Sequence, residues 1–216
     1  MALPQAQESV SHTPTDGRMR SFYRLQAPIY DQTRWAYLFG RRKAVASMGL
    51  KPGHYVLEVG CGTGLNFALL RSAVGPDGSV IGVDCSEQML ARARRRIARV
   101  GWSNVTVRHA SVPPLELEIS FDAVLFSYSL AMIEYWDQAL ARAAALLKPG
   151  GTLAVLEFGR FRSWPWPAGP IIRGWLRLHH VHTLRPVARY MIECLDDVQY
   201  HSKLGDYYFI ATGRGR

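Results

Sequence analysis

Two kinds of segment alternate along the middle of the chain, and they differ in how their apolar positions are spaced. One kind is short and almost continuously apolar, at 54–59, 79–83, 105–109, 122–126 and 152–158. The other is longer and carries apolar residues at helical spacing, at 65–74, 86–100 and 133–147. Short apolar runs fit strands that are buried on both faces, and helices between such strands are typical of a parallel sheet. The pattern therefore predicts an α/β fold with helices on both faces of the sheet.

The pattern changes on either side of this region. Residues 1–18 are polar with little periodicity, which predicts a mobile tail. Residues 19–50 favour helices interrupted near Pro28, and we expect them to form an N-terminal helical cap. Residues 159–192 hold six arginines, three tryptophans and no acidic residue, so we interpret them as a basic, Trp-rich insertion. Two further strands are expected at 198–203 and 207–212, and residues 19–216 are predicted to form a single domain.

The net charge bears on the partners of the protein more than on its fold. The 216 residues include 26 Lys and Arg against 17 Asp and Glu, a formal charge of +9. This excess predicts an anionic partner, either nucleic acid or an acidic membrane surface. The beginning has no signal-peptide pattern, and no run of about 18 apolar residues occurs, so we expect a cytoplasmic protein. The three scattered cysteines favour a reducing compartment over a disulfide framework.

The most informative segment is VLEVGCGTG at 56–64, which ends the first predicted strand and opens a helix. Its glycines allow a tight turn and a close approach of a ligand to the backbone. Asp84 follows the second strand, where a carboxylate can accept both hydroxyls of a ribose. The spacing G-x-G-x-G departs from the G-x-G-x-x-G of dinucleotide sites, and Glu58 is unfavourable beside a pyrophosphate. An acidic residue there suits a ligand that carries an ammonium and a sulfonium group.

Four motifs, in this order, resemble those of class I S-adenosylmethionine-dependent methyltransferases. They are VLEVGCGTG, GVDCSEQMLARAR, FDAVLFSYSLAMI and LLKPGGTLAVLEFG, all within 56–159. The resemblance implies S-adenosylmethionine as cofactor and a Rossmann-like seven-stranded methyltransferase sheet, with helices on both faces and an antiparallel last strand at 207–212. The implied cofactor site comprises Glu58 at the ammonium, Gly60, Cys61 and Gly62 along the methionine part, Asp84 at the ribose, and Cys85 and Met89 beside the adenine.

The segment after the third strand departs from the family pattern. Many members carry an acidic residue at the position of Ala110 or just beyond, whereas this chain continues as Ser111-Val112-Pro113. The adenine edge is therefore expected to rest on Ser111, through its hydroxyl or its backbone N–H. Val112 would add an apolar contact.

Segments outside these motifs resemble a narrower group, the bacterial betaine-lipid N-methyltransferases. They are FYRLQAPIYDQTRWAYLFGR, FSYSLAMIEYWDQAL and WLRLHHVHT, of which the first also resembles bacterial phosphatidylethanolamine N-methyltransferases. The resemblance implies N-methylation of an amino lipid head group, with diacylglyceryl homoserine converted to its trimethylated betaine. An anionic membrane surface is then the expected partner, and peripheral attachment to the inner face of the membrane the expected location.

Methyl transfer to an amine requires little chemistry from the protein itself. The enzyme holds the amine and the sulfonium methyl group about 3 to 3.5 Å apart. Aromatic faces stabilise the positive charge that grows on the acceptor. Tyr30 and Tyr128 are our candidates for this role, and Ser127 is our candidate for positioning the amine or the donor. A tyrosine at a strand end is equally compatible with a place in the core or at its rim.

Several alternatives stay open from the sequence. The same fold would serve C- or O-methylation of a quinone or another small hydrophobic acceptor, which predicts a pocket for an aromatic ring and a base near its hydroxyl. RNA or protein methylation would fit the charge, but the chain shows no nucleic-acid module, so nucleic acid is not the expected partner. A cofactor-binding subunit without activity is a further alternative, and residues 159–192 would equally form a cap over the substrate. No metal site is expected, because His179, His180 and His182 have no acidic residue nearby.

Overall fold

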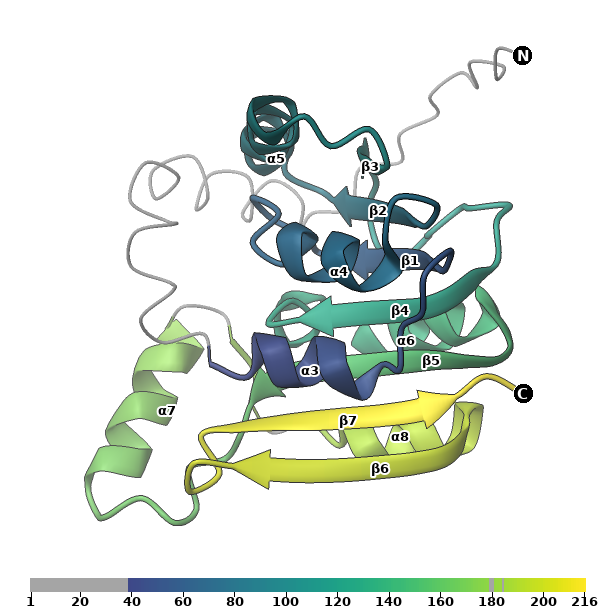
Figure 1. Ribbon diagram of the computed structural model, residues 1–216. Coiled ribbons are helices and arrows are strands. Elements are labelled where there is room, and N and C mark those ends of the chain that lie inside the picture. The colour runs from purple at the N-terminus through teal and green to yellow at the C-terminus, as the bar shows by residue number, and fades with distance from the viewer. Residues whose placement is uncertain (1–38, 179–180, 184) are drawn as a thin grey trace.

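The computed structural model describes residues 39–178, 181–183 and 185–216, which contain one seven-stranded sheet with helices packed against it (Figure 1). The strands are β1 (Tyr55–Val59), β2 (Ser79–Asp84), β3 (Val105–His109), β4 (Phe121–Ser127), β5 (Leu147–Phe158), β6 (Asp196–Lys203) and β7 (Tyr208–Arg214). Their order across the sheet is β3-β2-β1-β4-β5-β7-β6. Strands β1 to β5 pair in parallel, whereas β7 runs antiparallel to β5 and β6. The predicted sheet with an antiparallel last strand is confirmed.

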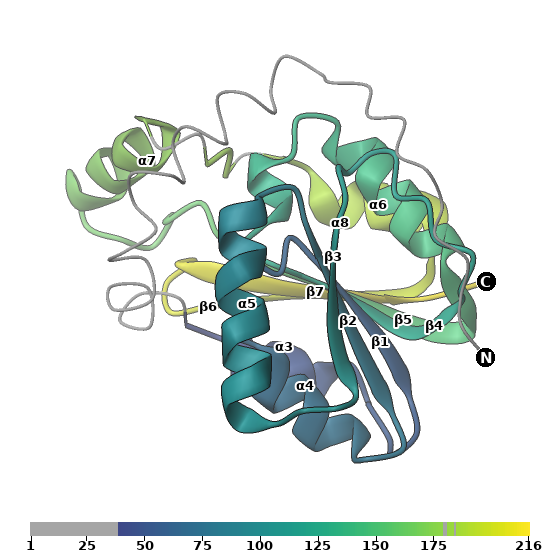
Figure 2. The ribbon, with the colours of Figure 1, turned by 90° about the horizontal axis from the view of Figure 1, so that it is seen from above.

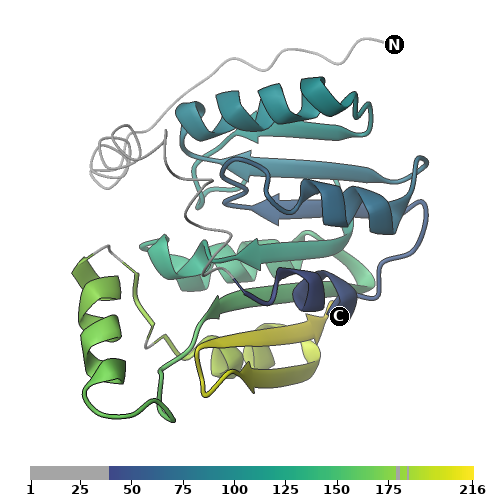
Figure 3. The ribbon, with the colours of Figure 1, turned by 60° about the vertical axis from the view of Figure 1, so that its left-hand side comes forward.

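The helices of the described residues lie on both faces of the sheet, as the alternating pattern predicts (Figures 1 and 2). One face carries α3 (Arg41–Ser47), α4 (Phe67–Val74) and α5 (Glu87–Val100). The other carries α6 (Trp136–Ala145) and α8 (Val187–Cys194), and the short 3-10 helix η1 (Leu130–Met132) follows β4. Helix α7 (Ala168–Leu178) stands beside the edge of the sheet where the parallel strands end (Figure 3).

Successive residues of each central strand build two separate cores. In β4, Ala123 and Leu125 belong to the core under α3, α4 and α5, while Val124 and Phe126 belong to the core under α6. All four side chains are almost completely buried. Alternation of side chains along a strand therefore explains why these strands are apolar at every position.

The ends of most elements lie within a few residues of the predicted ones. Helix α5 begins where the sequence predicts, because Ser86 Oγ accepts the N–H of Met89 at 3.4 Å, and it ends at Gly101 in the left-handed conformation. Strand β5 begins five residues earlier than the expected 152–158, because Leu147 pairs with Phe121 before a register shift. Only the end of the expected cap, residues 39–50, lies within the described residues, and it contains α3.

The expected insertion at 159–192 contains α7 and the first part of α8. Hydrogen bonds from two aromatic residues join its beginning to the β6–β7 turn. The N–H of Phe161 donates to the carbonyl of Asp206 at 2.9 Å, and Trp164 Nε1 donates to the carbonyl of Leu204 at 3.1 Å. None of the described helices combines the length and the apolarity needed to cross a bilayer.

Gly82 in β2 occupies a place where the core leaves no room for a side chain. An added Cβ would lie 2.7 Å from the ring of Phe67 and 2.8 Å from Cys61 Sγ. We expect Gly82→Ala to lower the free energy of unfolding by about 1–3 kcal/mol, the usual cost of overpacking. Urea denaturation measures the change. Gly174→Ala in α7 is the control, because nothing lies within 4 Å of its added Cβ and alanine favours a helix. Equal destabilisation by both substitutions would show that Gly82 is not a packing position.

Candidate active site

The glycine loop after β1 is shaped by a close approach of two strand ends. Gly60, Gly62 and Gly64 all have positive φ, at 70°, 56° and 75°. A Cβ on Gly60 would lie 2.4 Å from Cβ of Ser129, whereas a Cβ on Gly62 would meet nothing within 4 Å. Ser129, two residues after β4, donates its hydroxyl to the carbonyl of Val59 at 2.6 Å. The loop is thus pressed against the end of β4 at Gly60 and open at Gly62.

Asp84 closes this loop from the neighbouring strand. Its Oδ2 accepts the N–H of Gly62 at 2.8 Å, and its Oδ1 accepts the N–H of Ser86 at 2.9 Å. Burial raises the pKa of the Asp84 carboxyl, and the hydrogen bonds from Ser86 and Gly62 oppose that shift. The carboxylate therefore lies at the carboxyl end of β2, beside the backbone of the glycine loop.

Glu58 is buried at the end of β1, directly under the same loop. Its side chain is 2% exposed, and Oε1 accepts the amide of Asn66 at 2.6 Å. Among the described residues, Glu58 Oε2 and Asn66 Oδ1 have no hydrogen-bond partner. Burial raises the pKa of Glu58 to about 8, because a charged carboxylate is costly away from water, while Asn66 and Arg41 lower it. The arrangement leaves a carboxylate oxygen ready to pair with a cation.

Asn66 was missed by the sequence analysis, although it lies two residues after the last glycine of the loop. Its role depends on a contact with a residue eight positions earlier, and the helical turn at 64–67 brings the two together. Ser129 was also missed, because its contacts with Gly60 and Val59 join segments that are about seventy residues apart.

The remaining predicted cofactor residues surround the loop. Cys61 is a buried residue of the loop, and its Sγ points into the sheet toward Gly82. Its backbone is therefore the part available to a ligand at the loop. Met89 is buried in the first turn of α5. Cys85 is half-buried, and its carbonyl lies 3.0 Å from Nε2 of His109.

Ser111 and Val112 lie in the loop after β3 and are half-buried. The N–H of Ala110 donates to the carbonyl of Asp84 at 3.1 Å, which holds the beginning of this loop beside the end of β2. Val112 packs against the core on the α6 face. The structure thus gathers the nine predicted cofactor residues around the ends of β1, β2 and β3.

The predicted catalytic residues follow β4. Ser127 is half-buried at its last position, and Tyr128 adopts a positive φ of 55°. The Tyr128 hydroxyl donates to the carbonyl of Phe39 at 2.7 Å, and its ring centroid lies 4.6 Å from that of Phe158. Burial raises the pKa of this phenol above its usual value. Tyr128 is 5% exposed and belongs to the core, and Tyr30 lies outside the described residues.

A second buried carboxyl lies at the end of β5 and was not expected from the sequence. Glu157 is 3% exposed, and its Oε1 accepts the N–H of Ala131 in η1 at 3.0 Å. Its Oε2 has no partner among the described residues. Burial raises its pKa to about 7, while backbone N–H groups and Arg185 lower it. The periodicity of an apolar strand concealed this residue, because one acid in LAVLEF changes the pattern little.

The residues present fit S-adenosylmethionine by their chemistry. The unpartnered oxygen of Glu58 suits an ammonium, the open side of Gly62 allows a ligand to approach the backbone, and Asp84 offers acceptors for ribose hydroxyls. When bound, this cofactor supplies a methyl group on a positively charged sulfur. Within the described residues, no group of three or more His, Cys, Asp and Glu side chains has metal-binding geometry.

Comparison with known proteins agrees with this arrangement. A family model described as a methyltransferase domain matches residues 56–151. A demethylmenaquinone methyltransferase from Tropheryma whipplei is 33% identical over 175 residues, covering 79% of this chain and 70% of the relative. A solved S-adenosylmethionine-dependent methyltransferase from Aquifex aeolicus has a TM-score of 0.65 at 19% identity, covering 95% of this chain and 100% of that chain. Phosphoethanolamine N-methyltransferase 2 from Haemonchus contortus, solved with S-adenosylmethionine, has a TM-score of 0.72 at 17% identity. The match covers 90% of this chain and 59% of that chain.

Fold, glycine loop and relatives together define a methyltransferase that takes its methyl group from S-adenosylmethionine. The chain belongs to the class I S-adenosylmethionine-dependent methyltransferases. The narrower resemblance to betaine-lipid N-methyltransferases finds no support in these comparisons, because the relative from Tropheryma whipplei is named for a quinone.

Glu58 provides a test of cofactor binding with a defined pH dependence. Its pKa of about 8 means that the carboxyl is mostly protonated below that pH, and a cation binds the ionised form. We therefore expect the affinity for S-adenosylmethionine to rise with pH up to about 8, by up to about tenfold per pH unit. Glu58→Gln should bind about 10- to 100-fold more weakly at pH 8, as expected for loss of a charge-assisted hydrogen bond.

Isothermal titration calorimetry at several pH values measures both effects. Glu118→Gln, at an exposed position before β4, is the matched control and should behave as the unmodified protein. A Glu58→Gln variant that keeps the affinity and the pH dependence would show that this carboxyl does not contact the cofactor.

Proposed function

We propose that the protein methylates a ring carbon of a reduced quinone, an acceptor of the demethylmenaquinone class. The observation that carries the proposal is the 33% identity, over 79% of this chain, to a protein named demethylmenaquinone methyltransferase. C-methylation of a small hydrophobic acceptor was an alternative from the sequence, and it predicts a pocket for an aromatic ring with a base near the hydroxyl of that ring.

Aromatic side chains gather at the ends of β4 and β5. The ring of Tyr207 has its centroid 5.8 Å from Phe158, 5.5 Å from Phe161 and 5.8 Å from Trp164. Tyr128 extends this group through its contact with Phe158. Phe158, Phe161 and Tyr128 are buried, whereas Tyr207 and Trp164 are half-buried. These two rings would offer aromatic faces to a naphthoquinol, which stacks on such faces and needs few polar partners.

The reaction needs a proton acceptor, because a quinol attacks through its ring carbon most readily when its hydroxyl is ionised. Among the described residues, Glu157 is a buried carboxyl at this edge of the sheet with an unpartnered oxygen and a pKa of about 7. A group with that pKa accepts a proton near neutral pH. We assign Glu157 this role in the proposed reaction.

The cofactor-binding roles expected from the sequence are part of the same proposal. Glu58 would bind the ammonium and Asp84 the ribose hydroxyls, while Gly60, Cys61 and Gly62 would line the methionine part. Cys85, Met89, Ser111 and Val112 would surround the adenine. Ser127 is the last residue of β4, and β4 pairs with β1, the strand that leads into the glycine loop. At this position Ser127 would orient the acceptor.

N-methylation of an amino lipid, including diacylglyceryl homoserine and phosphatidylethanolamine, is the competing function. The aromatic group around Tyr207 would also stabilise a methylated ammonium. The quinol ranks first because the relative that is 33% identical over 79% of this chain is named demethylmenaquinone methyltransferase.

One reaction series distinguishes these acceptors. Purified protein and S-adenosylmethionine are incubated with a reduced demethylated naphthoquinone, and separately with vesicles containing diacylglyceryl homoserine or phosphatidylethanolamine. Mass spectrometry should detect one added methyl group on the quinol alone, and NMR should place it on carbon. A methyl group on oxygen or on either amino lipid would overturn the proposal.

Glu157→Gln tests the assigned proton acceptor in the same assay. Its kcat should fall by about 100-fold or more, the usual contribution of a general base. The affinity for S-adenosylmethionine should stay unchanged, which separates catalysis from folding. Glu193→Gln, at an exposed position on α8, is the control. An unchanged kcat in Glu157→Gln would exclude this residue as the base.

A further inference from the structure

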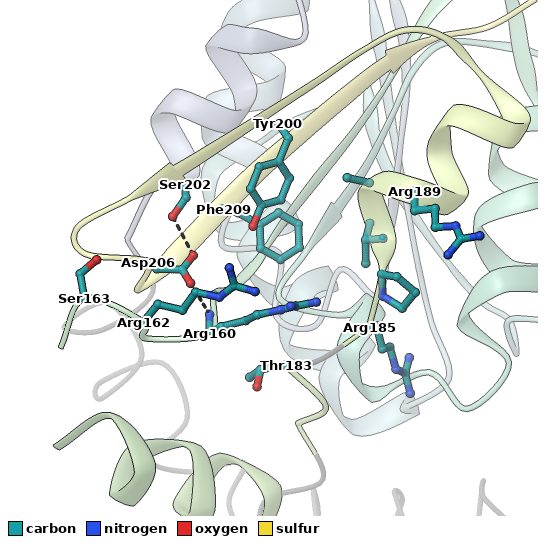
Figure 4. Close-up of a pocket in the computed structure, with 14 residues that line it drawn as sticks. Arg160, Arg162, Ser163, Thr183, Arg185, Arg189, Tyr200, Ser202, Asp206 and Phe209 are labelled. Atoms are coloured by element: carbon teal, nitrogen blue, oxygen red, sulfur yellow. Dashed lines mark hydrogen bonds between the residues drawn. The ribbon is translucent and has the colours of Figure 1, made fainter. Parts of the chain in front are cut away.

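A cavity of about 530 Å³ lies beyond the end of β5, between β6 and the segment that enters α8 (Figure 4). Its charged lining comprises Arg160, Arg162, Arg185, Arg189 and Asp206. Four arginines thus line the same cavity with a single carboxylate. In Figure 4 the side chains of Arg160 and Arg162 extend toward the segment that carries Arg185 and Arg189.

The one carboxylate is already engaged. Asp206 Oδ2 accepts the backbone N–H of Arg160 at 3.1 Å, and Oδ1 accepts the hydroxyl of Ser202 at 2.7 Å. Asp206 therefore organises the cavity wall and does not pair with a guanidinium among the described residues.

The arginines differ in what they contact. Arg185 Nη1 donates to the carbonyl of Leu130 at 2.7 Å, and its guanidinium lies 5.8 Å from the ring centroid of Trp136. The guanidinium groups of Arg160, Arg162 and Arg189 make no hydrogen bond or ion pair within the described part of the chain. Figure 4 shows Arg160 and Arg162 side by side, whereas the guanidinium of Arg189 extends away from them. The unpartnered pair Arg160 and Arg162 is suited to a phosphate, which accepts several hydrogen bonds at once.

The chain that joins the two sides of this cavity carries an exposed apolar stripe. In α7, Ile171, Trp175 and Leu178 recur at helical spacing and are 64%, 51% and 77% exposed. The opposite side of the helix packs inward, with Leu176 3% exposed. Arg162 and Thr183 both line the cavity, and α7, with its exposed apolar side chains, lies between them along the chain.

The charges of this segment indicate what covers the stripe. Residues 159–192 contain six arginines and no acidic residue, so a phosphate-rich surface is complementary to them. Exposed tryptophan beside arginine is the composition of helices that lie in the interface of a bilayer. A water-filled cavity for a free metabolite would not require exposed Ile, Trp and Leu next to it.

We propose that this face docks on an acidic phospholipid bilayer, with a lipid phosphate bound in the arginine cavity and the stripe of α7 inserted among the head groups. The proposal goes beyond the methyl transfer and does not depend on which acceptor is used. It assigns the arginine cavity a ligand of its own, separate from the cofactor held near β1 and β2.

Vesicle co-sedimentation of the 216-residue chain tests the proposal. Binding should be strong on phosphatidylcholine vesicles that contain phosphatidylglycerol and weak on phosphatidylcholine alone. The double variant Arg160→Gln/Arg162→Gln should lose about tenfold or more in affinity, as expected for two cations near an acidic surface. Arg95→Gln/Arg99→Gln, which removes the same charge from exposed positions of α5, should lose much less.

A variant in α7 and calorimetry with inorganic phosphate separate lipid docking from the alternatives. Trp175→Ser should weaken vesicle binding while calorimetry shows unchanged affinity for S-adenosylmethionine, which keeps docking separate from the methyltransferase site. Equal losses from the two double variants would show diffuse attraction and overturn the arginine cavity. Calorimetric binding of inorganic phosphate that depends on Arg160 and Arg162, without vesicle binding, would assign the cavity to a free phosphate and overturn the lipid proposal.

Discussion

The contact between Gly60 and Ser129 is the constraint on which the site depends. The end of β1 lies against the end of β4 here, because a Cβ added to Gly60 would be only 2.4 Å from Cβ of Ser129. The hydroxyl of Ser129 holds the carbonyl of Val59 in the same place. Beside this contact, Glu58 is buried at the end of β1, and Asp84 accepts the N–H of Gly62 in the glycine loop.

The carboxyl edge of the sheet changes its electrostatic character from one side to the other. Around β1 and β2 it presents Glu58 and Asp84, which suit a cationic cofactor. Beyond β5 it presents the arginine cavity, which suits an anion. Glu157 and the cavity residue Arg185 are both hydrogen-bonded to the backbone of η1. Under the docking proposal, these oppositely charged regions of one edge would serve the methyl donor and an acidic surface at the same time.

Acceptor choice is separate from this common framework. The methyltransferase family model ends at residue 151, and solved structures of similar fold include a phosphoethanolamine N-methyltransferase. Since one fold serves many acceptors, the acceptor is decided by elements that differ between members. In this chain α7, α8 and the aromatic group around Tyr207 all follow the matched region.

The sequence by itself determined the α/β class, the strand and helix order, the glycine loop and Asp84, because each follows from local spacing within a few residues. Only the tertiary structure decided that Asn66 binds Glu58, that Ser129 supports Gly60, and that Tyr128 is packed into the core. It also brought Arg160 and Arg162 to the same cavity as Arg185 and Arg189. These contacts join positions far apart along the chain or depend on the exact turn between them, and hydrophobic periodicity carries no information about such pairs.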